Sequence, residues 1–299
     1  MSANTWGALV LDWRQAQLAM TCADSLDQCH YPADELELCK VLVDNGSGDD
    51  ASLEYIEPTI SSKGWAIHKN ATNLGFAGGM NSGLECLAYA KPSYVLLLNS
   101  DITLARSAVA ELLQFVKTHP DAAIIGLSIS DAGPDQSSSG SVLRYYSWLG
   151  WARSIKADRA NFKTDYLNGA AMLCKTDFLN RIGGIPSNNF LYFEELQMRD
   201  KLLPNESIAL CRTAIASHIG GASTVECKSP SRHYYAALAC LRYTKNKYAY
   251  KFPTVLLTRL SWLAWLSLQT RTKAPLLDLL LAVFDLFTGK KRTPNPRKQ

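Results

Sequence analysis

Short apolar runs alternate with helix-like segments over the first 118 residues, and this alternation is what most constrains the fold. The apolar runs that read as strands lie at 7–11, 38–43, 65–68 and 94–98. The helix-like segments between and after them lie at 14–29, 51–61, 79–90 and 106–118. Alternating strands and helices are typical of a mostly parallel sheet with helices on both faces. Ligands bind such sheets beyond the carboxyl ends of the strands, so the chemistry is expected there.

Composition agrees with a large globular α/β protein. Of the 299 residues, 47% are hydrophobic and 19% are charged, which excludes a disordered or low-complexity chain. The eight cysteines contain no C-x-x-C pair, so neither structural zinc nor thioredoxin-like redox chemistry is expected. Scattered cysteines fit reduced thiols in a cytosolic protein. We find no signal-peptide pattern and no apolar stretch long enough to span a membrane.

The charge distribution divides the chain into an acidic body and a basic tail. From Arg242 to Gln299 there are 12 Lys and Arg against 2 Asp and Glu, whereas the preceding residues carry a net charge of −6. We therefore expect a catalytic-type domain over residues 1–250 and a basic, amphipathic helical region over 251–299. A tail of this kind suggests contact with an anionic surface.

Two polar clusters directly follow buried strands. Asp44 comes after the run 41–43, and Asn99 and Asp101 come after the run 94–98. Asp44 is placed to accept hydrogen bonds from a nucleotide base or ribose, although Asp-Asn-Gly-Ser is also ordinary turn composition. Asp101 is the kind of single carboxylate that holds Mg²⁺ or Mn²⁺ together with substrate phosphates, although a helix N-cap is an alternative.

A glycine-rich segment over residues 73–83 precedes a helix, which suits a diphosphate. It matches neither the dinucleotide G-x-G-x-x-G spacing nor the P-loop, so both of those classes are disfavoured. The alternative is a glycine turn packed against the sheet.

Two further candidates lie in the second half of the chain. Glu194 and Glu195 follow an aromatic run, and a carboxylate with a raised pKa is a plausible general base for a hydroxyl. The alternative is an acidic helix start that complements the helix dipole. His218 precedes two glycines and is a candidate phosphate or metal partner, although a lone histidine is more often structural.

The order and spacing of these segments resemble the inverting family-2 glycosyltransferases of the GT-A fold, most closely the bacterial rhamnosyltransferase-like branch. The matching segments are 43–47, 73–81, 97–101, 168–173, 183–185, 193–195 and 218–223. The resemblance implies a GT-A, Rossmann-like, mostly parallel sheet flanked by helices, with the C-terminal helices as an appendage.

The resemblance also implies roles for individual residues. Glu195 matches the second acid of the family's Glu-Asp pair, which is the general base, and it is one methylene longer than the usual Asp. Asp101 matches the metal-binding Asp of the D-x-D element, in which Asn99 replaces the first Asp, and His218 matches the His near the metal or diphosphate. The residues implied to bind substrate are Asp12, Asp44, Asn73, Gly75, Gly78, Asn81, Asn99 and Glu194.

The implied reaction is transfer of a sugar from a nucleoside diphosphate, with Mg²⁺ or Mn²⁺ as cofactor. Rhamnose is favoured, and deoxythymidine-diphosphate rhamnose or a UDP-hexose are the expected donors. The expected acceptor is a hydroxyl of a glycan or lipid-linked glycan in bacterial surface polysaccharide synthesis. A catalytically silent sugar-nucleotide-binding or scaffold protein is the alternative. Nucleic-acid binding is not expected, because the tail is too apolar to track phosphates and carries no nucleic-acid motif.

The tail predicts two apolar helices, 253–270 and 275–288, flanked by Lys and Arg. Trp262 and Trp265 are expected on one face, and Asp278 and Asp285, seven residues apart, on one side of the second helix. Tryptophan with basic flanks fits peripheral binding to the inner face of the cell membrane by a cytoplasmic protein. The alternatives are packing on the catalytic domain or a homo-oligomer interface.

Overall fold

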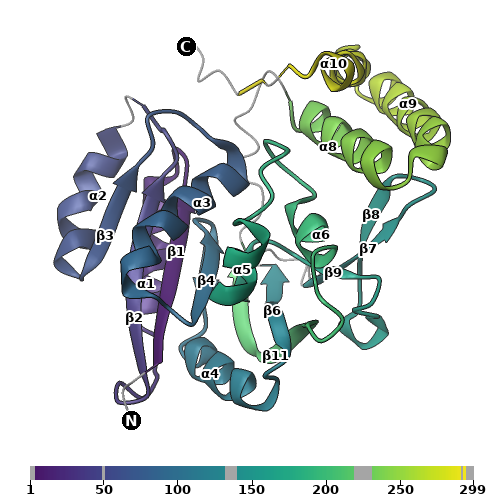
Figure 1. Ribbon diagram of the computed structural model, residues 1–299. Coiled ribbons are helices and arrows are strands. Elements are labelled where there is room, and N and C mark those ends of the chain that lie inside the picture. Colours follow the sequence, from purple (N-terminus) through teal and green to yellow (C-terminus); the bar gives the residue numbers. More distant parts are fainter. Residues whose placement is uncertain (1–3, 49–50, 132–139, 219–230, 291, 294–299) are drawn as a thin grey trace.

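The computed structural model describes residues 1–299 apart from 1–3, 49–50, 132–139, 219–230, 291 and 294–299 (Figure 1). The predicted loop at 131–140 therefore lies mostly outside the described residues, and so do the glycines that follow His218.

A mixed eight-stranded sheet forms the centre of the molecule, in the order β3-β2-β1-β4-β10-β6-β11-β5. Its strands are β1 (Asn4–Asp12), β2 (Leu36–Asp44), β3 (Trp65–Lys69), β4 (Tyr94–Asn99), β5 (Ile102–Leu104), β6 (Ala122–Asp131), β10 (Ala171–Lys175) and β11 (Ser207–His218). The first four strands pair in parallel, as the alternating pattern predicts, and β6 pairs in parallel with β11. Strand β10 runs antiparallel between β4 and β6, and β5 runs antiparallel to β11. These insertions make the sheet mixed while keeping the GT-A-like α/β architecture.

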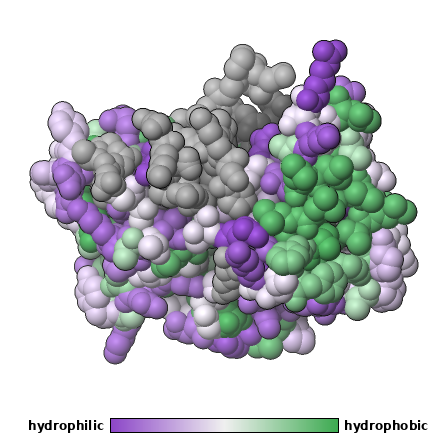
Figure 2. Space-filling model, turned by 90° about the horizontal axis from the view of Figure 1, so that it is seen from above, coloured by the Kyte–Doolittle hydropathy of each residue, from purple (hydrophilic) through white to green (hydrophobic). Residues whose placement is uncertain are grey.

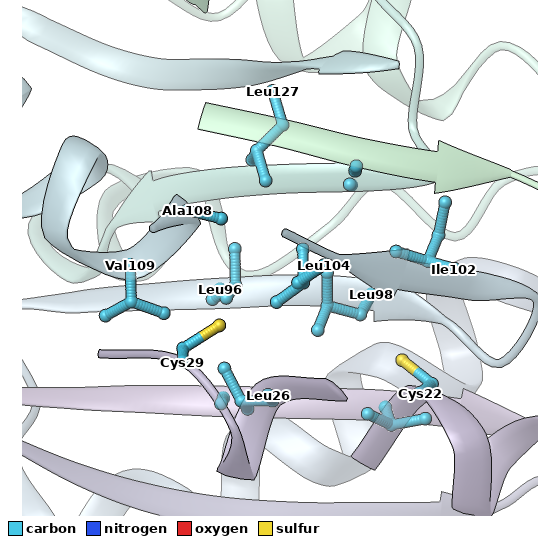
Figure 3. Packing of buried hydrophobic residues seen from close by; sticks show 14 of the residues in the cluster. Cys22, Leu26, Cys29, Leu96, Leu98, Ile102, Leu104, Ala108, Val109 and Leu127 are labelled. Carbon is cyan, nitrogen blue, oxygen red and sulfur yellow. The ribbon is translucent and has the colours of Figure 1, made fainter. Parts of the chain in front are cut away.

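Helices cover both faces of this sheet (Figure 1). They are α1 (Ala16–Asp27), α2 (Ala51–Ser62), α3 (Gly75–Leu87), α4 (Ala108–Thr118), α5 (Thr176–Ile182) and α6 (Glu194–Arg199), with short 3-10 turns η1 (Ala88–Ala90) and η2 (Ala157–Arg159). On one face, α1 and α4 bury their apolar sides against β4 and β5, where Cys22 and Cys29 lie among Leu26, Leu96 and Val109 (Figure 3). Burial raises the pKa of the Cys29 thiol to about 11, so this thiol stays protonated and serves as packing.

Helix α3 begins at Gly75, four residues earlier than the sequence pattern predicts, so the glycine-rich segment forms its first turns. The reason is close packing against the sheet. A Cβ on Gly83 would lie 2.7 Å from Cγ2 of Val43. Small residues on this face let the helix axis approach β1 and β2, which brings its N-terminus to the edge where those strands end.

A second layer joins a small sheet to the C-terminal helices. The sheet has the order β8-β7-β9, with β7 (Val142–Tyr146), β8 (Trp151–Ile155) and β9 (Tyr166–Leu167). The helices are α8 (Arg232–Lys247), α9 (Phe252–Gln269) and α10 (Ala274–Thr288), with the 3-10 turn η3 (Ala249–Lys251) before α9. One apolar cluster contains Tyr166, Phe193 and Leu196 together with buried residues of all three C-terminal helices. The tail helices therefore share a core with the segment that carries Glu194 and Glu195.

Polar residues of α10 turn towards α8. Asp285 is fully buried and accepts a hydrogen bond from the Tyr234 hydroxyl at 2.8 Å, and Asp278 accepts one from Ser231. The outward side of α10 is consequently apolar. No helix in the described ranges combines the length and the apolar character needed to cross a bilayer.

Candidate active site

A cavity of about 600 Å³ lies at the edge where β1 and β4 end. Eight residues predicted from the sequence line it: Asp12, Asn73, Gly75, Asn99, Asp101, Glu194, Glu195 and His218. They come from segments far apart in the chain and belong to one cavity because β1 and β4 are neighbours in the sheet. Ligand sites beyond the carboxyl ends of parallel strands are expected in such sheets.

Asp101 and His218 lie next to each other in this cavity. Asp101 follows β4, and His218 ends β11, which pairs with β5 directly after Asp101. Their Oδ2 and Nε2 atoms are 3.3 Å apart. Two neighbouring ligands of a small divalent cation stand about 3 Å apart, since each lies about 2.1 Å from it. A carboxylate and an imidazole at this separation fit Mg²⁺ or Mn²⁺.

Protein groups would supply only part of that metal's coordination. Across the described part of the chain, no group of three or more His, Cys, Asp and Glu side chains could hold a metal ion. Mg²⁺-type sites often use one or two carboxylates plus substrate phosphates and water. The remaining ligands would therefore come from a bound diphosphate and solvent.

Asn45 organises the loop that enters the cavity before α3. Its side-chain amide donates to Oδ1 of Asn73 and to the carbonyl of Gly75, each at 3.0 Å, and its Oδ1 accepts from the backbone N–H of Leu74 at 3.1 Å. Asn73 in turn accepts from the N–H of Gly75 at 2.9 Å. The sequence pattern does not single out Asn45, although this residue adjoins Asp44 and lines the cavity.

Gly75 joins this loop to the segment that precedes the two glutamates. Its φ is +77°, in the left-handed region, and a Cβ there would lie 2.2 Å from the carbonyl oxygen of Phe190. The same carbonyl accepts a hydrogen bond from the N–H of Phe76 at 3.0 Å. Only glycine allows this approach, so Gly75 holds this loop against the chain that leads to Glu194.

Tyr192 and Phe193 form an unusual backbone turn directly before the two glutamates. Both have φ in the left-handed region, at 75° and 74°, directly before α6. Such conformations cost about 1–3 kcal/mol for each non-glycine residue and concentrate at functional sites. Here the turn brings Glu194 and Glu195, the first residues of α6, to the cavity.

The two glutamates differ in their surroundings. Glu194 is 2% exposed, and its Oε1 has no hydrogen-bond partner among the described residues. Burial and the charge of Glu195 raise the pKa of Glu194 well above its ordinary value. Burial also raises the pKa of Glu195, but hydrogen bonds from its own backbone and from that of Gly169 oppose this. Of the pair, Glu195 therefore has the greater support for its ionised form.

Gly169 fits directly against the carboxylate of Glu195. A Cβ at this position would lie 2.0 Å from Oε1 of Glu195. The neighbouring Ala170 accepts a hydrogen bond from the N–H of Asn99 at 2.9 Å, which ties this loop to the end of β4. Gly169 lies within one of the segments that carry the family resemblance, but only the fold places it beside residue 195.

Three residues predicted to bind substrate do not line the cavity: Asp44, Gly78 and Asn81. Asp44 closes a turn by accepting from the N–H of Ser47 at 2.9 Å. Asn81 bonds Ile185 twice, donating to its carbonyl at 2.9 Å and accepting from its N–H at 2.8 Å, so it fastens α3 to the chain after α5. Gly78, in the first turn of α3, sits against the side chain of Leu74, the residue before the helix.

A sequence comparison now decides the family. The profile of glycosyl transferase family 2 matches residues 15–183, more than half of the chain. The chain belongs to glycosyl transferase family 2. The matched region carries Asp101 and Gly169, whereas Glu195, His218 and the C-terminal helices of this family-2 protein follow it. A search of curated proteins found no match.

Solved structures share the fold of this family-2 chain at low sequence identity. A mannosyltransferase from Pyrobaculum calidifontis in complex with GDP-Man and Mn²⁺ is 15% identical, with a TM-score of 0.58, and the match covers 97% of this chain and 89% of that one. TarS 1-349 from S. aureus in complex with UDP-GlcNAc is 18% identical, with a TM-score of 0.58 and coverage of 95% and 81%. GalNAc-T7 with UDP, GalNAc and Mn²⁺ is 13% identical, with a TM-score of 0.62 and coverage of 96% and 58%. Against another TarS structure, the match spans 42% of that chain.

Proposed function

We propose that this protein is an inverting glycosyltransferase that moves a sugar from a nucleoside diphosphate to a hydroxyl of a glycan or lipid-linked glycan. The observation that carries the proposal is that Glu195 and the Asp101–His218 pair line one cavity. The resemblance to the rhamnosyltransferase-like branch favours rhamnose as the sugar and bacterial surface polysaccharide synthesis as the setting.

The reaction needs a base on one side of the sugar and charge stabilisation on the other. Glu195 accepts the proton of the acceptor hydroxyl, whose oxygen attacks the anomeric carbon as the bond to the diphosphate breaks. Attack from the face opposite the leaving group inverts the configuration. A divalent cation bound at Asp101 and His218 would neutralise charge on the diphosphate. The loop of Asn45, Asn73 and Gly75 would position the nucleotide.

The solved structures support the ligand class. One neighbour holds GDP-Man with Mn²⁺, and another holds UDP-GlcNAc. We infer that this chain also takes a nucleotide sugar with Mg²⁺ or Mn²⁺, and we assign the metal contacts to Asp101 and His218.

A thermal-shift panel tests donor binding. Deoxythymidine-diphosphate rhamnose, UDP-glucose and GDP-mannose are each titrated with Mn²⁺, with Mg²⁺ and with EDTA. A ligand at about 100 times its Kd stabilises the native state by about 2.7 kcal/mol, which raises the Tm of a domain of this size by roughly 4 °C. We expect one donor to give such a shift with metal and a smaller one with EDTA.

Two variants make the panel specific to the site. Asp101→Asn should lose the metal-dependent part of the shift, whereas Asp34→Asn, an exposed carboxylate of an ordinary turn, should keep it. A chain that no nucleotide sugar stabilises would contradict the proposal. Donor binding without transfer or donor hydrolysis would favour the catalytically silent alternative.

The outer surface of α9 and α10 leads us to propose peripheral membrane attachment. Eight large apolar side chains there are 41–78% exposed. They are Leu257, Leu260, Trp265, Leu268, Leu277, Leu280, Phe284 and Phe287. Figure 2 shows a broad hydrophobic area on this side of the molecule. Exposed Arg271 and Lys273 lie in the turn between the two helices, and Lys290 follows them. An apolar surface with basic residues at its margin suits an anionic membrane surface.

Vesicle flotation tests this attachment. Truncation before Pro253 is unsuitable, because Val255 and Leu263 belong to the shared core. We instead expect the double variant Trp265→Ser, Phe284→Ser to lose most binding to phosphatidylglycerol-containing vesicles, because both side chains are more than half exposed in the apolar surface. Tyr55→Ser, which changes an 84% exposed residue on α2, is the matched control and should float as the wild type does. Equal flotation of all three proteins would exclude the proposal.

A further inference from the structure

Helix α9 and strand β8 contribute three side chains to the same cavity as Glu195. Arg259 and Trp262 come from α9, and Trp151 is the first residue of β8. None of them belongs to the eight-stranded sheet that carries Asp101 and His218, and α9 lies beyond the region that the family profile matches. They therefore line the cavity from the second layer of the molecule, outside the sheet that carries Asp101 and His218.

Arg259 is a buried cation that has no carboxylate partner among the described residues. It is 8% exposed, and one of its Nη atoms donates to the carbonyl of Gly150. Its Nε is buried and has no hydrogen-bond partner within the described residues, where no ion pair involves this guanidinium. A buried charge is costly unless it is paired, and arginine is suited to carboxylates and phosphates because of its fork of donors. The arrangement fits a guanidinium whose counter-ion arrives with a ligand.

The two tryptophans form an aromatic corner around this cation. The rings of Trp151 and Trp262 meet edge to face, with centroids 5.2 Å apart and an interplanar angle of 89°. The guanidinium carbon of Arg259 lies 5.6 Å from the centroid of Trp151. Trp262 also contacts the ring of His233, with a centroid separation of 5.8 Å, which holds the indole in place. Rigid aromatic faces in a pocket bind the apolar C–H face of a sugar ring at little conformational cost.

We propose that this corner is the acceptor subsite and that it selects an anionic acceptor. An acceptor sugar stacks on the indole of Trp262 or Trp151, and a phosphate or carboxylate on that acceptor pairs with Arg259. The hydroxyl to be glycosylated then lies in the cavity that Glu195 lines. This inference rests on the proposed transferase function and adds the chemical class of its acceptor.

Small glycosides test the subsite without knowledge of the natural acceptor. The probes are glucose 1-phosphate, methyl β-glucuronide, neutral methyl β-glucoside and inorganic phosphate. Each is titrated into the full-length protein saturated with Mn²⁺ and the nucleoside diphosphate of the donor that the thermal-shift panel identifies, with tryptophan fluorescence and calorimetry as readouts. We expect both anionic sugars to bind at least 10-fold tighter than the neutral glucoside and than phosphate alone. Preference for one anion would tell whether a phosphate or a carboxylate is the natural group.

Variants separate recognition from a structural role of Arg259. Arg259→Gln should remove the preference for the anionic sugars and leave neutral glucoside binding unchanged, whereas Arg259→Lys should keep part of the preference. Trp262→Ala should weaken all three sugars and leave inorganic phosphate unaffected. Arg271→Gln, which removes an exposed charge from the α9–α10 turn, should bind every probe as the wild type does. If Arg259→Gln does not fold, as judged by circular dichroism, Arg259→Lys and Trp262→Ala still test the assignment.

Several outcomes would overturn the proposal. These are equal binding of charged and neutral sugars, an unchanged preference in the Arg259 variants, and phosphate alone binding as tightly as glucose 1-phosphate. The donor thermal-shift panel is run on the same variants. Loss of donor stabilisation in the wild type would count against the transferase, whereas intact donor stabilisation without an anionic preference would count against this subsite alone.

Discussion

Replacing Glu195 by glutamine is expected to lower sugar transfer by about 10²–10⁴-fold, the usual contribution of a positioned general base. Glutamine keeps the length and shape of the side chain but does not accept a proton. The hydrogen bond from the Gly169 backbone can still form with the amide oxygen of glutamine, so the fold and the donor site should be undisturbed. Product formation gives the rate, and the thermal shift with the preferred donor shows that binding is retained.

Glu194→Gln is the matched control for this prediction. Burial and the neighbouring charge raise the pKa of Glu194 well above its ordinary value, which favours the neutral acid. An amide is close in shape and polarity to that acid, so we expect less than a tenfold loss of rate. The reverse pattern, in which Glu195→Gln keeps wild-type turnover and Glu194→Gln does not, would show that the base has been assigned to the wrong carboxylate.

Local pattern was sufficient to predict the four parallel strands β1 to β4, half of the sheet, and the edge of the sheet at which the cavity lies. The runs before Asp44 and Asp101 form β2 and β4, and strand ends at one sheet edge converge, as parallel pairing requires. The family resemblance then linked distant segments, and eight of the eleven selected residues line the cavity. That much depends on chain order and periodicity, which a sequence displays directly.

The remaining features depend on contacts between segments that no local pattern encodes. The sequence does not show that Asn81 bonds Ile185, that Gly169 adjoins Glu195, or that Arg259 reaches the cavity. An asparagine near the start of a glycine-rich helix can hydrogen-bond either to a ligand or to the backbone of a distant segment. The packing of α3 against the chain after α5 determines that Asn81 does the second. Likewise, the sequence predicted the tail helices correctly but left open whether they pack on the body, and the shared core around Tyr166 answers this.

Gly169→Ala is expected to produce the second large effect, by displacing the base. An added Cβ would stand 2.0 Å from Oε1 and 2.8 Å from Cδ of Glu195, so the carboxylate must move. The backbone of Gly169 lies outside the left-handed region, and alanine therefore fits the main chain without strain. Displacement of a reacting group by about 1 Å costs roughly 10²-fold in rate. We expect a loss of this order in kcat, with donor thermal shifts and circular dichroism unchanged.

Shortening the side chain at position 195 distinguishes this steric mechanism from a general loss of structure. Glu195→Asp removes one methylene and draws the carboxylate back from residue 169, so alanine there should no longer collide with it. Substitutions of contacting residues are coupled in double-mutant cycles. In the Glu195→Asp background, Gly169→Ala should therefore lower kcat by less than about tenfold. The loss from alanine would then depend on the length of the side chain at position 195, which links this glycine to the base itself. An equal loss from alanine in both backgrounds, or none in either, would show that Gly169 does not position the carboxylate.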